Sequence, residues 1–80
     1  MNQYGKERRF RLELGKVVRS YRLKLGLSQE EFAEKTNIHR TYVSSIELGK
    51  VDVGLAITYK IANVLGVSLS QLLKQVENNL

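Results

Sequence analysis

A short polar stretch over residues 39–48 carries the side chains best suited to binding chemistry. At about 100° per residue in a helix, one side collects a guanidinium group, three hydroxyl groups and one leucine: Arg40, Thr41, Ser44, Ser45 and Leu48. An arginine can donate two hydrogen bonds to guanine O6 and N7, and threonine or serine can bond other base edges. This side is too polar to be buried within the protein, and its alternative role is that of a solvated helix face.

The residues around this stretch indicate two short helices joined by a tight turn. Ser28 and Glu31 have the spacing of a capping box, which starts a helix ending near Thr36. Asn37 tolerates the left-handed backbone of a turn, and the second helix follows over residues 39–48. This layout is that of a helix-turn-helix, in which the second helix lies in the major groove of DNA.

Three further segments with helical periodicity complete the chain. The predicted helices span residues 9–25, 28–36, 39–48, 54–65 and 68–76. Their apolar positions include Phe10, Leu14, Val17, Val18, Tyr21, Leu25, Leu55, Ile61, Ala62, Leu65, Leu69, Leu72, Leu73 and Val76. The sequence contains no proline and no sustained strand-like alternation, so glycine, serine and asparagine separate the helices. We therefore predict one compact all-α, five-helix domain over residues 1–80, with a flexible basic start at 1–8 and a frayed tail at 77–80.

Composition narrows the classes of function. The 80 residues include 13 Lys plus Arg, 8 Asp plus Glu, no cysteine and a single histidine, His39. This inventory excludes disulfides, thiolate nucleophiles and cysteine-ligated zinc, and it argues against a histidine metal site. Without a paired nucleophile and base or a glycine-rich phosphate loop, we expect no enzyme, no cofactor and no metal. We also expect a cytoplasmic protein. No apolar run is long enough to span a bilayer, and no apolar stretch follows the basic start as it would in a signal peptide.

Positive charge is concentrated near the start of the chain. Residues 1–27 hold eight basic and two acidic side chains, a net charge of +6, so the remainder carries −1 of the total +5. Lys6, Arg8, Arg9 and Arg11 cluster before or at the start of the first helix. These residues are either a solvated terminus or a helix end that meets phosphates. An anionic membrane is a weaker alternative, because the core needs the apolar face of this helix.

The stretch LSQEEFAEKTNIHRTYVSSIELGK resembles the DNA-binding domains of the phage repressor and Cro type, also called the XRE family. The later IANVLGVSLSQLL resembles the end of the same domain, so the resemblance covers residues 14–74. HRTYVSSIE further resembles the controller proteins of restriction–modification systems. The resemblance implies a lambda-repressor-like fold, a homodimer and a pseudo-palindromic operator in double-stranded DNA. Such controllers usually lack a ligand domain, so we expect no small-molecule ligand and no membrane partner.

The resemblance also assigns roles by position. Four residues match base-reading positions or lie beside them: Arg40, Thr41, Ser44 and Ser45. Four match positions that contact phosphate or sugar: Gln29, His39, Tyr42 and Lys50. Arg22 and Glu47 match an interhelical ion pair, whose alternative is two solvated charges. The last two helices supply the candidates for a dimer interface, although some of these residues must fill the core: Ile57, Leu69, Leu72 and Val76.

Several positions depart from the family pattern. Leu48 stands where arginine or asparagine is frequent, Asp52 is acidic in a loop that is often basic, and Gly54 replaces the usual serine or threonine cap. Ile57 and Thr58 stand where a polar and an aliphatic residue, respectively, are expected. These departures concern the loop and the fourth helix, and they leave the recognition helix intact.

The leading prediction is a sequence-specific transcriptional regulator that binds double-stranded DNA as a homodimer. The alternative is an antitoxin or a protein-interaction module of the same fold. The operator sequence stays open, because base preferences of side chains are degenerate and DNA shape contributes. The choice between activation and repression stays open as well.

Overall fold

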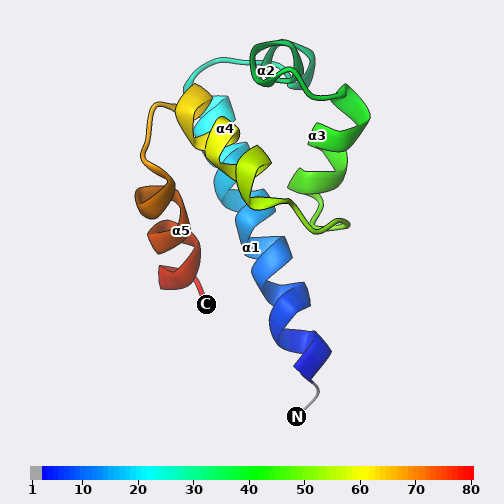
Figure 1. Cartoon of the computed structure of the whole chain (residues 1–80), viewed down its shortest axis with the longest axis vertical. Helices are drawn as coiled ribbons and strands as arrows, with labels where there is room; N and C mark the ends of the chain where they lie inside the picture. Colours follow the sequence, from blue (N-terminus) through cyan, green and yellow to red (C-terminus); the bar gives the residue numbers. More distant parts are fainter. Residues whose placement is uncertain (1–2) are drawn as a thin grey trace.

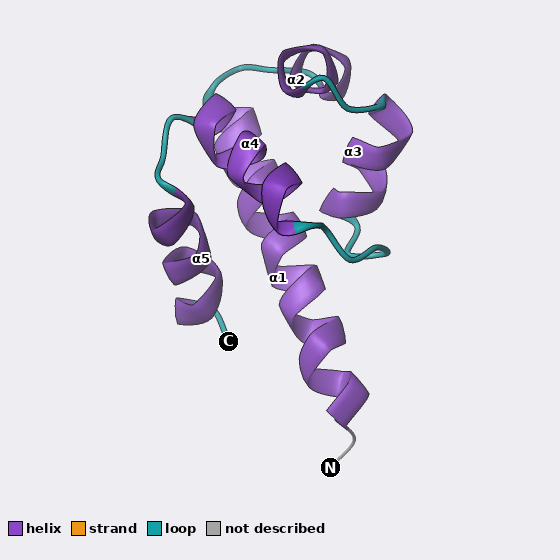
Figure 2. Ribbon diagram, in the orientation of Figure 1, coloured by secondary structure: helices purple, strands orange, loops and turns teal. Residues whose placement is uncertain are grey.

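The computed structural model describes residues 3–80, with side chains from Gly5 onward, and this part of the chain forms five helices (Figure 1). They are α1 (Gln3–Lys24), α2 (Gln29–Thr36), α3 (Arg40–Glu47), α4 (Leu55–Leu65) and α5 (Leu69–Asn78). Short loops join them, and residues 3–80 contain no strand (Figure 2). The all-α, five-helix prediction is therefore confirmed. None of the described helices is long and apolar enough to cross a membrane.

Side-chain caps determine where α2 and α5 begin. Ser28 Oγ accepts a hydrogen bond from the Glu31 N–H at 3.0 Å, and Glu31 Oε1 accepts one from the Ser28 N–H at 2.9 Å. Ser68 and Gln71 repeat this reciprocal arrangement at α5, with distances of 3.1 and 2.9 Å. Each capping box satisfies two backbone groups that lack partners within the helix. Gly54 starts α4 without a side-chain cap, as its identity predicts.

The core lies around α1, which contacts α3, α4 and α5. In Figure 1, α3 and α5 lie on opposite sides of α1, and α2 packs against α3 and α4 at one end. The most deeply buried apolar side chains come from all five helices: Val18, Phe32, Val43, Ile61, Leu72 and Val76. Burying these side chains together is the main stabilising term of the fold.

Two threonines lie among these apolar side chains, and each satisfies its hydroxyl group within its own helix. Thr36 Oγ1 donates to the Phe32 carbonyl at 2.7 Å, and Thr58 Oγ1 donates to the Gly54 carbonyl at 2.9 Å. Bonding to a carbonyl four residues earlier removes the cost of burying an unpaired hydroxyl. Thr58 can therefore occupy a core position where an aliphatic side chain was expected.

The first and last helices are longer than predicted. α1 begins at Gln3 rather than near Arg9, so residues 3–8, which were predicted to be flexible, are helical; residues 1–2 lie outside the described part. No helix breaker other than Gly5 precedes Arg9, and lysine, glutamate and arginine are good helix formers. α5 reaches Asn78, two residues into the predicted frayed tail, because the buried Val76 anchors its last turns.

Burial also corrects four predicted positions. Leu25 and Leu55 were predicted in the core, but they are 50% and 69% exposed. Leu25 follows the end of α1, and Leu55 is the first residue of α4, where it does not lie on the inner face of that helix. Leu72 and Val76, predicted at a dimer interface, are both fully buried. These two residues are therefore the candidates that fill the core, because they form the inner stripe of α5 within a single chain.

Candidate nucleic-acid interface

Two glycines hold α3 close to α1. A β-carbon at Gly15 would lie 2.5 Å from the Glu47 carbonyl oxygen and closer still to that of Ile46. A β-carbon at Gly49 would lie 2.8 Å from a methyl group of Leu12, and Gly49 also has a φ of +70°. Both distances are too short for a real side chain, so only glycine permits this crossing. Sequence reasoning missed this role of Gly15 in packing, because no local pattern shows which backbone it meets.

A buried ion pair joins the same two helices. Arg22 Nε donates to Glu47 Oε2 at 2.6 Å, and Arg22 Nη2 donates to Oε1 at 3.0 Å. The remaining Arg22 Nη1 donates to the Leu27 carbonyl at 2.8 Å. The two hydrogen bonds that Arg22 donates to Glu47 raise the pKa of Arg22 above its ordinary value, although burial acts in the opposite direction. The predicted ion pair is thereby confirmed, and it ties the C-terminal turn of α3 to α1.

The same carboxylate orients a side chain at the start of α2. Gln29 Nε2 donates to Glu47 Oε1 at 3.1 Å, and Gln29 is half-buried. A side-chain amide has two N–H donors, so this bond uses only one of them. The second is a donor for an anion at the N-terminus of α2, where the backbone is also electropositive. This geometry is compatible with the phosphate contact predicted for Gln29.

The turn before α3 has the predicted conformation. Asn37 is in the left-handed region, with φ 56° and ψ 42°. His39 caps α3, because its Nδ1 accepts a hydrogen bond from the Thr41 N–H at 3.1 Å. A neutral imidazole that accepts at Nδ1 carries its proton on Nε2. The exposed His39 ring therefore retains one N–H donor for a partner.

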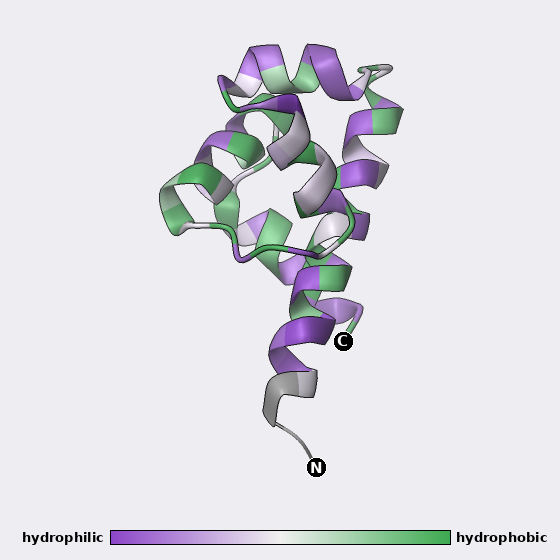
Figure 3. Ribbon diagram, turned by 90° about the vertical axis from the view of Figure 1, so that its right-hand side faces the viewer, coloured by the Kyte–Doolittle hydropathy of each residue, from purple (hydrophilic) through white to green (hydrophobic). Residues whose placement is uncertain are grey.

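The outward side of α3 combines exposed and half-buried polar groups. Figure 3 looks at the molecule from the side on which α3 lies. Arg40 and Thr41 are exposed, and Ser44 and Ser45 are half-buried. Val43 and Ile46 face the core instead. Helix α3 thus presents hydrogen-bonding groups on its outward side and packs its apolar side against the core.

Other predicted contact residues differ in exposure. Lys50 and His39 are exposed, whereas Tyr42 is half-buried and packs against the core. Leu48 is 55% exposed at the end of α3, so an apolar group is part of this surface. Arg40 Nε lies 3.7 Å from Glu30 Oε1, an interhelical contact that the sequence did not reveal. No local spacing rule links these two residues, because they belong to different helices.

A second ion pair anchors the segment between α3 and α4. Arg11 Nη1 lies 3.2 Å from Asp52 Oδ1. Asp52 was expected to oppose a nearby phosphate, and its charge is instead partnered by a guanidinium from α1. The pair lies beside Gly49, which contacts Leu12. Sequence reasoning missed it, because 41 positions separate the two residues.

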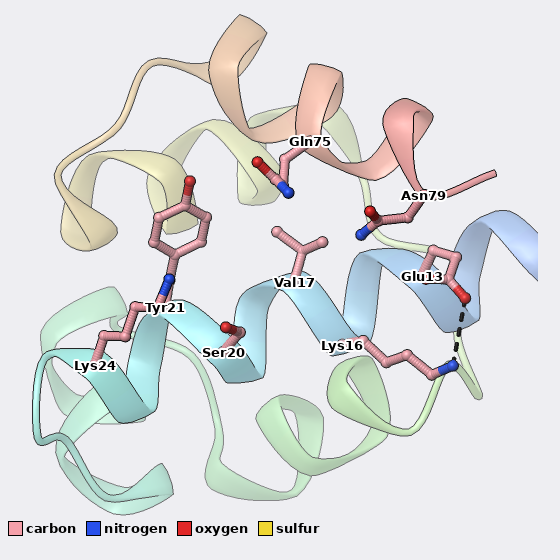
Figure 4. A pocket seen from close by; sticks show the side chains of 8 residues that line it. All are labelled: Glu13, Lys16, Val17, Ser20, Tyr21, Lys24, Gln75 and Asn79. Atoms are coloured by element: carbon pink, nitrogen blue, oxygen red, sulfur yellow. Dashed lines mark hydrogen bonds and ion pairs between the residues drawn. The ribbon is translucent and has the colours of Figure 1, made fainter.

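A shallow pocket of about 290 Å³ lies between α1 and α5 (Figure 4). Tyr21 and Gln75 are among the side chains that line it. Lys16 Nζ lies 3.3 Å from Glu13 Oε2, and Lys24 Nζ lies 5.6 Å from the centre of the Tyr21 ring. The pocket is therefore on the α5 side of α1, away from α3, and it is separate from the polar surface of α3.

Two short helices, a left-handed turn and an exposed polar side on the second helix define the class of helix-turn-helix proteins. The helix-turn-helix family profile matches residues 18–72. The chain belongs to this family, of the XRE type, whose members are DNA-binding transcriptional regulators.

Individual relatives agree with this assignment. The control protein C.MunI of a Mycoplasma species is 48% identical over 54 residues, which are 68% of this chain and 73% of that protein. The crystal structure of the restriction-modification controller protein C.AhdI from Aeromonas hydrophila has a TM-score of 0.74 and 33% identity, covering 76% of this chain and 92% of that one. The crystal structure of the clp gene regulator ClgR from Corynebacterium glutamicum has a TM-score of 0.82 and 27% identity. The match covers 88% of this chain and 74% of that one.

Proposed function

We propose that this regulator is a controller protein of the restriction–modification type, which binds a pseudo-palindromic operator as a homodimer in the prokaryotic cytoplasm. The observation that carries the proposal is the outward surface of α3. Arg40 and Thr41 are exposed there, and Gln29 begins the helix that precedes the turn. The similarity of the chain to C.MunI and C.AhdI supports a controller role over other regulatory roles.

In this proposal the outward side of α3 reads bases in the major groove. Arg40 bonds guanine O6 and N7 with both arms of its guanidinium, and Thr41 contacts an adjacent base or a thymine methyl group. Ser44 and Ser45 are half-buried, which limits them to short-range contacts at the edge of the groove. The sequence preference of the protein then comes mainly from the first turn of α3.

Phosphate contacts set the position of α3 in the groove. Gln29 and His39 each have one side-chain N–H left after their internal hydrogen bonds. Lys50 lies just beyond α3 and is exposed. Tyr42 keeps its ring against the core and reaches the backbone with its hydroxyl group. Such contacts fix register but carry no sequence information directly.

The dimer places two copies of α3 about 34 Å apart, one turn of B-DNA. Of the four interface residues predicted from the sequence, Ile57 and Leu69 remain candidates, because both are only half-buried. Leu55 and Tyr59, which are 69% and 56% exposed on α4, join them. These exposed apolar side chains gain stability when a second copy covers them.

Selection of bound duplexes from a random pool, followed by sequencing, tests the function. We expect a pseudo-palindromic consensus that is bound at least about 1,000-fold more tightly than unrelated duplexes at physiological salt. Arg40→Ala should abolish this preference, whereas Lys74→Ala, which removes an equal charge from α5, should retain it. Binding without sequence preference would overturn the proposal. For a controller, the selected sequence should also recur upstream of the gene for this chain, beside a restriction enzyme gene.

A further inference from the structure

The N-terminal turns of α1 carry positive charge that the fold does not use. Lys6, Arg8 and Arg9 are all exposed, and none takes part in an ion pair of the described residues. Figures 1 and 3 show this end of α1 projecting beyond the other helices. Burial in the core therefore does not account for these side chains.

Contacts further along α1 show which way Arg8 faces. Arg11 pairs with Asp52, and Leu12 lies against Gly49, so this side of α1 faces the segment between α3 and α4. Residues three and four apart on a helix are neighbours on one face. Arg8 is three residues before Arg11 and four before Leu12, so it lies on the same side, one turn further out.

Arg9 faces another side of the same helix. It is four residues before Glu13, which pairs with Lys16 and lines the pocket between α1 and α5. Figure 4 shows that pocket on the side of α1 that faces α5. Adjacent arginines of equal charge and similar exposure thus point toward different surfaces, which makes Arg9 a matched control for Arg8.

The side on which Arg8 lies is continuous with the end of the recognition helix. Lys50 lies three residues beyond the end of α3 and is exposed, and the next residues lead to Asp52, which pairs with Arg11. An α3 inserted in a major groove about 12 Å wide is flanked by both phosphate backbones. A row of three basic residues, Lys50, Arg11 with its partner Asp52, and Arg8, would therefore face one of these backbones.

We propose that this row, the basic flank of α1, is a second contact surface for the DNA backbone, with Arg8 as its outermost phosphate-binding residue. The inference rests on the proposed function, because it assumes that α3 enters the groove. The partner is DNA rather than an anionic membrane, because Leu14 is buried and Phe10 packs against the core, which leaves α1 without an apolar face to insert.

The salt dependence of binding tests the basic flank. Equilibrium constants are measured at several salt concentrations for the wild type, Arg8→Gln, Arg9→Gln and Lys50→Gln, on the selected operator and on an unrelated duplex. The slope of log K against log salt is negative, and each lost phosphate contact lowers its magnitude by about 0.9. We expect that loss for Arg8→Gln on both duplexes, with an unchanged specificity ratio, and no loss for Arg9→Gln.

The inference is overturned if Arg8→Gln keeps the wild-type slope, or if Arg8→Gln and Arg9→Gln lower it equally, which would indicate diffuse charge. It is also overturned if only binding to phosphatidylserine vesicles depends on Arg8. A wild type without sequence preference would refute the proposed function alone, because the slope on an unrelated duplex still tests Arg8. A wild type that binds no duplex would refute both. Circular dichroism checks that each variant is folded.

Discussion

The guanidinium group of Arg40 is only loosely held in the free protein. Its Nε lies 3.7 Å from Glu30 Oε1, and the two side chains are 59% and 79% exposed. An exposed pair of this kind contributes well under about 1 kcal/mol. A bidentate bond to guanine discriminates against other bases by about 1–3 kcal/mol. A guanine can therefore displace Glu30 from Arg40 at little cost.

Replacing Arg40 by lysine separates charge from shape at this position. Lysine keeps the positive charge but loses the planar pair of donors. Two duplexes are compared: the operator, and an operator in which the contacted guanine is changed. We expect the preference for the first over the second to fall about 5- to 150-fold in Arg40→Lys. The salt slope should stay unchanged. Competition binding by fluorescence anisotropy measures both, with Lys35→Arg as the control; an undiminished preference would contradict the assignment.

At the scale of elements, the position of α3 depends on its crossing with α1. Gly15 allows the backbones to approach, and the Arg22–Glu47 pair fixes the contact with hydrogen bonds as short as 2.6 Å. Breaking a buried ion pair costs about 3–5 kcal/mol, yet forming one often adds little net stability. The pair therefore serves orientation more than stability, and the same carboxylate also orients Gln29.

Gly15→Ala tests this crossing. In an open helix, alanine in place of glycine stabilises by about 1 kcal/mol. At Gly15 the added carbon overlaps two backbone carbonyls, and overpacking of this kind costs about 1–3 kcal/mol or more. We expect a net loss of up to about 2 kcal/mol in the free energy of unfolding by urea, where the control should gain stability. Gly5→Ala, with open space around its β-carbon, is the control, and equal stability of both variants would refute the close crossing.

The two capping boxes differ in their response to pH. Hydrogen bonds from the backbone and hydroxyl of Ser28 lower the pKa of Glu31, whereas Gln71 in the equivalent position of α5 does not ionise. A carboxylate whose pKa is lower in the folded state stabilises the fold at any pH above its pKa in the unfolded chain, about 4.3. This stabilisation is lost as the pH falls through the pKa of the folded state.

Thermal unfolding between pH 7 and pH 3 reveals this difference. We expect the Tm of the wild type to fall more steeply below about pH 4.3 than that of Glu31→Gln, which keeps a capping box but cannot titrate. Gln71→Glu should add a comparable dependence at α5. Parallel profiles for the wild type and Glu31→Gln would rule out the contribution of the ionised cap.

For the whole molecule, the distribution of apolar surface bears on assembly. Leu55 and Tyr59 are one turn apart on α4, and both are more than half exposed. Leu72 and Val76, which the sequence made candidates for the interface, are fully buried in the core. The proposed dimer surface therefore centres on α4 rather than on α5.

Leu55→Asp tests the dimer directly. A charge at a covered apolar position disfavours association, because burying it unpaired is costly. We expect analytical ultracentrifugation to show a shift toward monomer and operator binding to weaken by at least about tenfold, the equivalent of 1.4 kcal/mol. Leu23→Asp changes a leucine of 51% exposure on α1 and should have no such effect. A dimer that survives Leu55→Asp but is lost in Leu23→Asp would place the interface on α1.

Much of the fold could be predicted because its signals are local. Ser28 with Glu31, Ser68 with Gln71 and the left-handed Asn37 act within a few residues, so spacing alone identifies them. The Arg22–Glu47 pair was also predicted, but only through resemblance to a family. Local periodicity was less reliable at helix ends: Leu55 fits a helical stripe, yet it lies at the first residue of α4 and is exposed.

By itself, the sequence determined the helix-turn-helix and the polar side of its second helix, because helix periodicity and capping depend on neighbours in the chain. Only the tertiary structure decided how α1 contacts α3 and the segment between α3 and α4. It showed that Gly15 admits α3 and that Arg11 pairs with Asp52 across 41 positions. These relations join residues far apart in the chain, and no local rule sets the distance between segments that meet only when the protein folds.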